Sequence, residues 1–275
     1  MKVGANVTKI KVGDRVTVEP HVGCGKCEFC HRELTNICDN KIAPGTPKWI
    51  GSFVEYFNAP EDKIYKVNDN VSYELATLIE PLAVAVHAMR RAAAERKDCV
   101  VILGAGTIGL LTLVVARELG YKKIICTDTV EDNCKMALKQ GATAAFNPLT
   151  EDVPARVREL TNGRGADLAI IAAGADNILD QASQCVCKRG EIGLVAMITK
   201  KIPFYCYSVV FNEQTIYGSM TYESKDFKEA ADMINNGLDL NDFITQKLPL
   251  EKTQEALDIL SQKKEYVVKV IVEVA

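Results

Sequence analysis

From about residue 98, short apolar runs alternate with helical segments, and this alternation restricts the possible folds more than any other feature. The run Cys99–Leu103 is continuously apolar, as a parallel strand buried on both faces requires. Further strands are expected at 123–128, 166–172, 191–197 and 214–218, and helices at 110–119 and 131–140. Strands alternating with helices of this length predict an α/β fold with a doubly wound parallel sheet.

A glycine-rich segment, Gly104-Ala-Gly-Thr-Ile-Gly109, joins the first strand to the first helix. The pattern G-x-G-x-x-G is weak evidence alone, but here it follows a strand and opens a helix. Gly104 permits a tight turn, Gly106 lets a pyrophosphate approach the backbone, and Gly109 lets the helix pack on the strand. The segment therefore predicts a dinucleotide site. A close-packed turn without a ligand is the alternative.

Asp128, nineteen residues after the last glycine, supports this interpretation. It ends the second strand, where its carboxylate can accept hydrogen bonds from both ribose hydroxyls of the adenosine half. The amides of Thr107 and Ile108, at the positive end of the helix dipole, would hold the phosphates. The Asp128 charge would repel a 2′-phosphate and no arginine follows closely, so we expect NAD rather than NADP.

Four cysteines lie within fifteen residues: Cys24, Cys27, Cys30 and Cys38. In a reducing compartment, clustered thiols are typical of a metal site. Zinc suits four thiolates because it is borderline soft and takes a tetrahedral shell. Four sulfurs leave no open position for a substrate, so we expect a structural zinc. Disulfides or unliganded thiols are the alternatives.

The other six cysteines are scattered. Cys99, Cys126 and Cys206 lie in strand-like apolar runs, where a free thiol behaves as a small hydrophobic residue. None of the six is next to a histidine that would serve as a base, so we do not expect a thiolate nucleophile among them.

The composition excludes several other classes of protein. The formal net charge of −3 gives no basic surplus to hold nucleic acid. No apolar run reaches the roughly 18 to 20 residues that span a bilayer, and the first residues, Met1–Asn6, have no apolar signal region. We therefore expect a cytoplasmic protein without a membrane or nucleic-acid partner.

A four-cysteine loop followed by a dinucleotide fold resembles the zinc-dependent medium-chain dehydrogenases, along the whole chain. Val12–Val16 is similar to the family's strand–turn segment, Gly51–Tyr56 to its return strand, and Ile79–His87 to the helix that enters the cofactor domain. The pair Glu80-Pro81 most resembles the polyol branch, typified by sorbitol dehydrogenase. One position departs from the family. Five residues after the acidic residue that binds the ribose, the family often has a basic residue, and this sequence has Asn133.

The resemblance implies three segments: a truncated GroES-like, β-rich lobe with the zinc loop at 1–79, a Rossmann NAD-binding domain at 80–220, and a return to the first lobe at 221–275. It implies that Glu80 is a catalytic residue at or near a metal, and that Val195 and Met197 border the nicotinamide. A helix near 251–262 and a last strand at 266–274 are expected. The resemblance also implies a homodimer or homotetramer acting on a small alcohol or polyol.

Two histidines have competing interpretations. His87 lies seven residues after Glu80, about two helical turns, so the two side chains share a helix face. A metal pair is conceivable on that spacing, but a packed histidine is favoured. His21, just after Pro20, is also expected to be structural.

In the family, a catalytic cysteine and a Gly-His-Glu triplet precede the segment similar to Val12–Val16, and this sequence contains neither. Of the expected ligands of a catalytic zinc, only Glu80 is present. One hypothesis is therefore an NAD-dependent polyol dehydrogenase whose upstream segment completes the site. The other is a catalytically incomplete protein that binds NAD and structural zinc.

Overall fold

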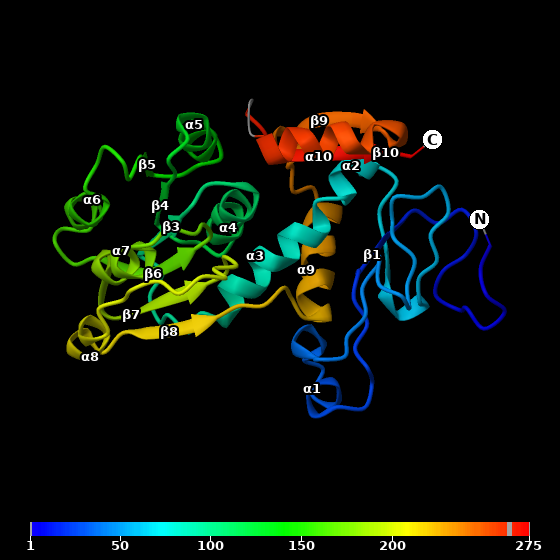
Figure 1. Cartoon of the computed structure of the whole chain (residues 1–275), viewed down its shortest axis with the longest axis horizontal. Coiled ribbons are helices and arrows are strands. Elements are labelled where there is room, and N and C mark those ends of the chain that lie inside the picture. Colours follow the sequence, from blue (N-terminus) through cyan, green and yellow to red (C-terminus); the bar gives the residue numbers. More distant parts are fainter. Residues whose placement is uncertain (1, 263–265, 275) are drawn as a thin grey trace. The chain divides into compact units, whose positions relative to one another are not determined.

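The computed structural model describes residues 2–262 and 266–274, so the ends of the predicted segments 1–79 and 221–275 lie outside the described residues. The chain forms two compact units, each with its own core: Met1–Ala83 with Thr221–Ala275, and Val84–Met220 (Figure 1). Among the described residues, no helix combines the length and the apolar character needed to cross a membrane.

The unit Val84–Met220 is built on a six-stranded parallel sheet, which confirms the predicted doubly wound fold. Its strands lie side by side in the order β5-β4-β3-β6-β7-β8. The direction in which strands are added reverses between β3 and β6, which is where such sheets bind ligands. The strands are β3 (Cys99–Leu103), β4 (Lys123–Thr127), β5 (Ala144–Phe146), β6 (Ala166–Ile171), β7 (Val186–Leu194) and β8 (Thr215–Gly218).

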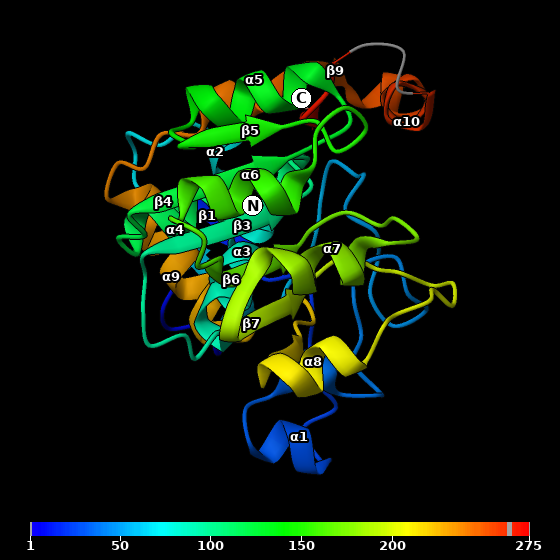
Figure 2. The ribbon, with the colours of Figure 1, turned by 90° about the vertical axis from the view of Figure 1, so that its left-hand side faces the viewer.

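Helices cover both faces of this sheet (Figure 2). On one face, α6 and α7 bury Val157, Ala182 and Cys185 against alternate side chains of β3 and its neighbours. Elsewhere α4 packs on β3 and β4 and contacts α5. The helices are α4 (Thr107–Glu118), α5 (Glu131–Lys139), α6 (Val153–Leu160), α7 (Ile178–Cys185) and α8 (Tyr207–Asn212); α3 (Ile79–Arg91) contains the boundary between the units.

The unit Met1–Ala83 with Thr221–Ala275 has short strands in two pairs. β1 (Val16–Val18) pairs antiparallel with β2 (Ile64–Lys66), and β9 (Ile244–Pro249) pairs parallel with β10 (Lys269–Glu273). Its helices are α1 (Glu28–His31), α2 (Tyr73–Ala76), α9 (Ser224–Asn235) and α10 (Thr253–Gln262), with 3₁₀ turns η1 (Thr35–Ile37), η2 (Glu61–Lys63), η3 (Asn241–Phe243) and η4 (Leu250–Lys252).

The strand predicted at 191–197 differs from the observed β7, which begins and ends earlier. Val186 pairs with Ala166, and after a shift in register Glu191 pairs with Leu168. Arg189, with φ of 58°, turns the chain within this bulge. Gly190 follows in a tight space, because a Cβ there would lie 2.9 Å from the Cys187 carbonyl oxygen.

Two segments that were expected to be strands are not strands. Gly51–Tyr56 forms bends, with Tyr56 80% exposed, because none of the described strands pairs with it and a strand needs a hydrogen-bonded neighbour. Cys206 is exposed just before the short helix α8 and does not lie in a buried strand. By contrast, Cys99 and Cys126 are buried in β3 and β4, as predicted.

Candidate functional site

The turn between β3 and α4 has space only for glycine at two positions. Gly104 has φ of +106°, and a Cβ there would lie 2.5 Å from the Ala173 Cβ. A Cβ on Gly109 would lie 1.8 Å from the Gly104 carbonyl oxygen. At Gly106, which caps α4, a Cβ would meet nothing within 4 Å. The backbone of Gly106 is therefore open to a ligand, whereas Gly104 and Gly109 serve close packing.

The first turn of α4 presents its amides at the same place. The intrahelical ladder begins with the Leu110 amide, which donates to the Gly106 carbonyl across 2.8 Å. Thr107 and Ile108 come before Leu110 in the helix, ahead of this first hydrogen bond, and amides in this position are directed out of the helix end. Together with the helix dipole they form a surface suited to phosphate oxygens.

Asp128 is held against this turn. It follows β4 directly, and its Oδ2 accepts from the Ala105 amide at 2.8 Å while its Oδ1 accepts from the Val130 amide at 2.9 Å. The side chain is half-buried. These two bonds fix the carboxylate beside the glycine turn, and each oxygen keeps a lone pair for a further donor such as a ribose hydroxyl.

Val195 and Met197 follow the carboxyl end of β7. The Val195 amide donates to the Ile171 carbonyl at the end of β6, across 3.1 Å. Met197 is 89% exposed. Leu103, the last residue of β3, pairs with Thr127 and with Ile171. The glycine turn, Asp128 and Val195 thus all lie at the carboxyl ends of the strands of this sheet.

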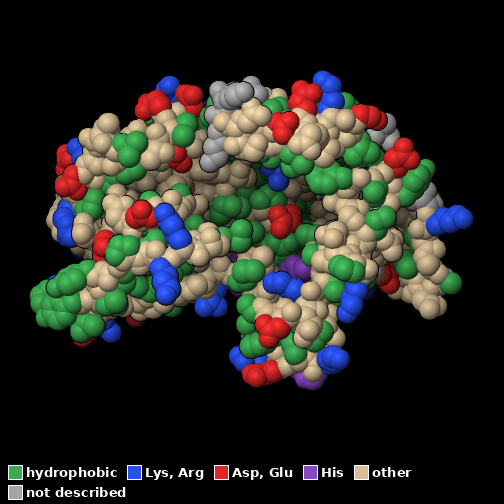
Figure 3. Space-filling view, in the orientation of Figure 1, with side chains coloured by type: hydrophobic (Ala, Val, Ile, Leu, Met, Phe, Trp, Pro, Cys, Tyr) green, Lys and Arg blue, Asp and Glu red, His purple; other side chains and the backbone are tan. Residues whose placement is uncertain are grey.

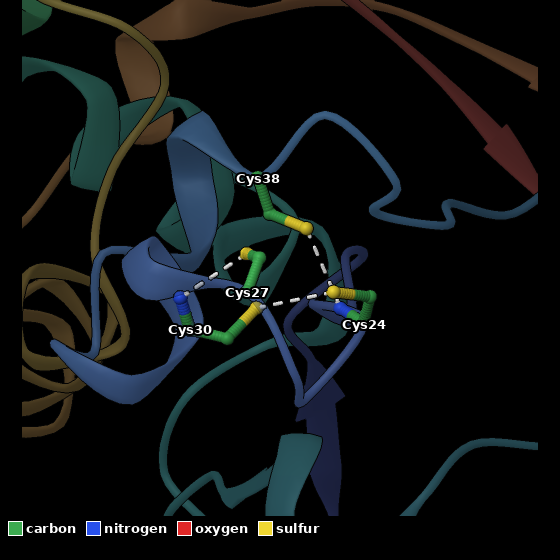
Figure 4. A group of neighbouring side chains, drawn as sticks. All are labelled: Cys24, Cys27, Cys30 and Cys38. Atoms are coloured by element: carbon green, nitrogen blue, oxygen red, sulfur yellow. Dashed lines mark hydrogen bonds between the residues drawn. The ribbon is translucent and has the colours of Figure 1, made fainter.

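The four cysteine sulfurs converge in the other unit (Figure 4). They lie within 4.8 Å of one another, and the Cys24 and Cys30 sulfurs are 3.9 Å apart. A tetrahedron with zinc–sulfur bonds of about 2.3 Å has sulfurs about 3.8 Å apart. The thiols are free, and 3.9 Å is far longer than a disulfide bond of about 2.05 Å. The geometry fits a zinc ion and disagrees with a disulfide framework.

Local structure brings these cysteines together. Cys27 caps α1 and its Sγ accepts from the Cys30 amide at 3.4 Å, while the Cys24 amide donates to the Cys38 Sγ at 3.5 Å. Gly23 is required, because a Cβ there would lie 2.7 Å from the Cys30 Sγ. The Lys26 amide and the neighbouring thiols lower the pKa of Cys24 to about 6. Despite the Cys30 amide, burial and the neighbouring thiols raise the pKa of Cys27 to about 11. Cys24 is therefore the thiol of this pair that more readily forms the thiolate that binds metal.

Glu80 lies in the first turn of α3 and is half-buried. Its Oε1 accepts a hydrogen bond from the Tyr222 hydroxyl at 3.0 Å. Burial raises the pKa of Glu80, and the Tyr222 hydrogen bond and the charge of Lys269 oppose that rise. Tyr222 was not predicted from the sequence, because no local motif marks a tyrosine 142 residues away. His87, on the same helix, is buried.

Two family models match the chain: a zinc-binding dehydrogenase model over residues 107–236, and an alcohol dehydrogenase GroES-like domain model over residues 1–69. The chain is 36% identical over 260 residues to the probable D-xylulose reductase A of Aspergillus clavatus, covering 93% of this chain and 73% of that protein. It is 34% identical over 272 residues to the sorbitol dehydrogenase of Bacillus subtilis, covering 98% and 77%.

Solved structures agree with these matches. An oxidoreductase/dehydrogenase of unknown specificity from Escherichia coli superposes with a TM-score of 0.94 at 32% identity, covering 99% of this chain and 79% of that one. The 2R,3R-butanediol dehydrogenase of Bacillus subtilis superposes with a TM-score of 0.90 at 29% identity, covering 99% and 77%. The chain therefore belongs to the zinc-dependent medium-chain dehydrogenase superfamily, in its sorbitol dehydrogenase-like branch.

Proposed function

We propose that this protein is an NAD-dependent polyol dehydrogenase, in which a secondary alcohol group of a polyol transfers a hydride to NAD and releases its hydroxyl proton as the ketone forms. The relatives that support this proposal are a D-xylulose reductase, a sorbitol dehydrogenase and the D-arabitol-phosphate dehydrogenase of Enterococcus avium, the last 34% identical over 279 residues. The proteins these names describe act on polyols or on the corresponding ketose.

The chain's own residues have separate tasks in this proposal. The turn Gly104–Gly109 and the amides of Thr107 and Ile108 bind the pyrophosphate, and Asp128 binds the adenosine ribose. Val195 and Met197, which follow the carboxyl end of β7, border the nicotinamide. Bound NAD supplies a hydride acceptor at C4 of its nicotinamide ring. Glu80 places its carboxylate near the alcohol group of the substrate.

The zinc held by the four cysteines is structural in this proposal. Four thiolates complete a tetrahedral shell, and such a closed site has no position for a substrate oxygen. Its role is to hold the loop 23–38, which has only short helices of four and three residues. A metal that orders such a loop contributes directly to the folding free energy.

We also propose a homo-oligomer that forms through α8 and the neighbouring edge of the sheet. β8 is the last strand of the sheet order, the preceding helix α8 exposes Tyr207, Val210 and Phe211, and Tyr205 is exposed just before that helix. Hydrophobic side chains gather at the place of α8 in Figure 3. Phe211→Lys should then lower the mass measured by light scattering, whereas Leu149→Lys, at another exposed apolar position, should not. An unchanged mass in Phe211→Lys would exclude this surface.

One observation carries the proposed function: Asp128 is hydrogen-bonded to the amide of Ala105, within the glycine turn that opens α4. The test is calorimetric titration of the purified chain with NAD and NADP, followed by assay of NADH formation from sorbitol or xylitol. We expect NAD to bind more tightly than NADP, and NADH to form. Binding without turnover would identify a catalytically incomplete NAD- and zinc-binding protein. No binding of either nucleotide would contradict both.

A further inference from the structure

The Tyr222 side chain is almost completely enclosed, with 1% of its surface exposed. Its hydroxyl donates to Oε1 of Glu80 at 3.0 Å. Burial and the nearby Glu80 charge raise the pKa of Tyr222, so the hydroxyl keeps its proton and stays a donor. In the described part of the chain, no ion pair holds Glu80, and this is the one hydrogen bond found for its carboxylate.

Two aromatic side chains of the same unit hold the Tyr222 ring. The centroid of the His21 ring lies 5.1 Å away at an interplanar angle of 45°, and that of Phe227 lies 5.6 Å away at 47°. Tilted contacts at these distances are favourable and directional. The ring is therefore fixed from two sides, and the direction in which its hydroxyl points is fixed with it.

His21 is itself held by a buried polar cluster. It is 6% exposed, its Nε2 lies 3.3 Å from Oε1 of Glu19, and its ring contacts Thr35 of the cysteine loop at 3.5 Å. Glu19 is completely buried and accepts hydrogen bonds from Lys63 at 2.8 Å, Tyr65 at 3.0 Å and Ser224 at 2.9 Å. A network satisfied in this way is rigid.

We infer that Tyr222 is a positioning residue that holds the Glu80 carboxylate in one orientation, and that His21 holds Tyr222 in place for this task. The inference rests on the proposed function, in which Glu80 places its carboxylate near the alcohol group of the substrate. A half-buried carboxylate without an ion pair samples several rotamers unless a donor selects one. Tyr222 supplies that donor without adding a charge.

Tyr222→Phe tests this inference, because it keeps the ring and removes only the hydroxyl. Tyr217→Phe is the control: it also removes a partly buried hydroxyl, but that hydroxyl donates to the Ala88 carbonyl at 3.0 Å, outside the network around Glu19. The readout is the ¹³C resonance of the Glu80 side-chain carboxyl in glutamate-labelled protein, assigned by its disappearance in Glu80→Gln. We expect this resonance to shift and broaden in Tyr222→Phe and to stay in place in Tyr217→Phe.

A second measurement uses the same assigned resonance in the unmodified protein. A carboxylate that accepts from a hydroxyl should show an isotope shift of its ¹³C resonance between H₂O and D₂O, and Glu80 should show one. For turnover, loss of a hydrogen bond to a charged group should lower kcat about tenfold in Tyr222→Phe, with the KM for NAD unchanged. Tyr217→Phe should change neither constant.

The outcomes separate this inference from the proposed function. If the unmodified chain binds no NAD and forms no NADH, the proposed function fails, while the Glu80 resonance still reports on Tyr222. If that resonance is the same in Tyr222→Phe as in the unmodified protein, or moves equally in Tyr217→Phe, the positioning role is wrong. Absence of the isotope shift would overturn it as well.

Discussion

The hydroxyl of Tyr222 and Oε1 of Glu80 lie 3.0 Å apart, although 142 residues separate them in the chain. Glu80 lies at the start of α3, and Tyr222 lies just before α9. The two segments meet because the chain returns to its first unit at Thr221, after completing the six-stranded sheet. A hydrogen bond of this kind depends on that return and on nothing in either local sequence.

Alanine at two glycines of the turn should affect different properties: stability at Gly109 and NAD affinity at Gly106. Gly109→Ala should lower the free energy of unfolding by at least about 2 kcal/mol, because its methyl would lie 1.8 Å from the Gly104 carbonyl oxygen. Gly106→Ala should change that free energy by no more than about 1 kcal/mol, yet weaken NAD binding about tenfold or more by filling the approach to the backbone. Urea unfolding and calorimetry measure both. Full NAD affinity in a folded Gly106→Ala protein would place the pyrophosphate elsewhere.

Asp128→Asn should reduce the preference for NAD over NADP. The change removes the charge that repels a 2′-phosphate and weakens the hydrogen bonds to the ribose, so NAD affinity should fall about tenfold. Affinity for NADP should fall less or rise. Titration with each nucleotide measures the ratio, and Asp132→Asn, an exposed position on α5, is the control. The same ratio in Asp128→Asn and in the unmodified chain would exclude Asp128 as the ribose ligand.

Cys38→Ser should remove the bound zinc. The purified chain should contain at least one zinc ion, and the variant should contain about one ion fewer, because three thiolates bind zinc more weakly than four. The melting temperature should fall in the variant, and in the unmodified chain treated with a chelator. Elemental analysis and thermal unfolding measure these changes. Cys206→Ser, at an exposed cysteine outside the loop, should keep the zinc. Zinc retained in full by Cys38→Ser would contradict the assignment.

The free energy of unfolding should decrease as the pH falls from about 6.5 to about 4. Burial lowers the pKa of His21 to about 4, although Glu19 opposes this and Lys63 and Lys41 add to it. The unfolded chain therefore takes up a proton at a higher pH than the folded chain. The contribution of His21 to the free energy of unfolding is complete above pH 6.5, the pKa of histidine in the unfolded chain. It decreases by about 2 to 3 kcal/mol as the pH falls toward 4, the pKa of His21 in the folded chain.

Urea unfolding as a function of pH measures this dependence. His21→Gln should flatten the slope between pH 6.5 and 4, whereas His31→Gln, at an exposed histidine on α1, should keep it. Burial raises the pKa of Glu80, which acts in the opposite sense, so the comparison of the two histidine variants is the decisive one. Equal slopes in both variants would show that His21 does not cause the pH dependence.

The sequence by itself determined the features whose physical cause is local. The apolar run Cys99–Leu103 predicted β3, because a strand covered on both faces needs apolar side chains throughout. The spacing of Gly104, Gly106 and Gly109 predicted the turn, because two of these positions have no space for a Cβ. The cysteine spacing predicted a convergent cluster, because fifteen residues with tight turns bring four sulfurs together.

Tertiary structure alone decided what depends on distant partners. Gly51–Tyr56 resembles a strand of the family, but a strand exists only where a neighbour supplies hydrogen bonds, and none of the described strands does so for this segment. Tyr222, His21 and Glu19 form one buried network across segments far apart in the chain. The energy of such contacts comes from burial and mutual orientation, which arise only when the chain is folded, so no spacing in the sequence encodes them.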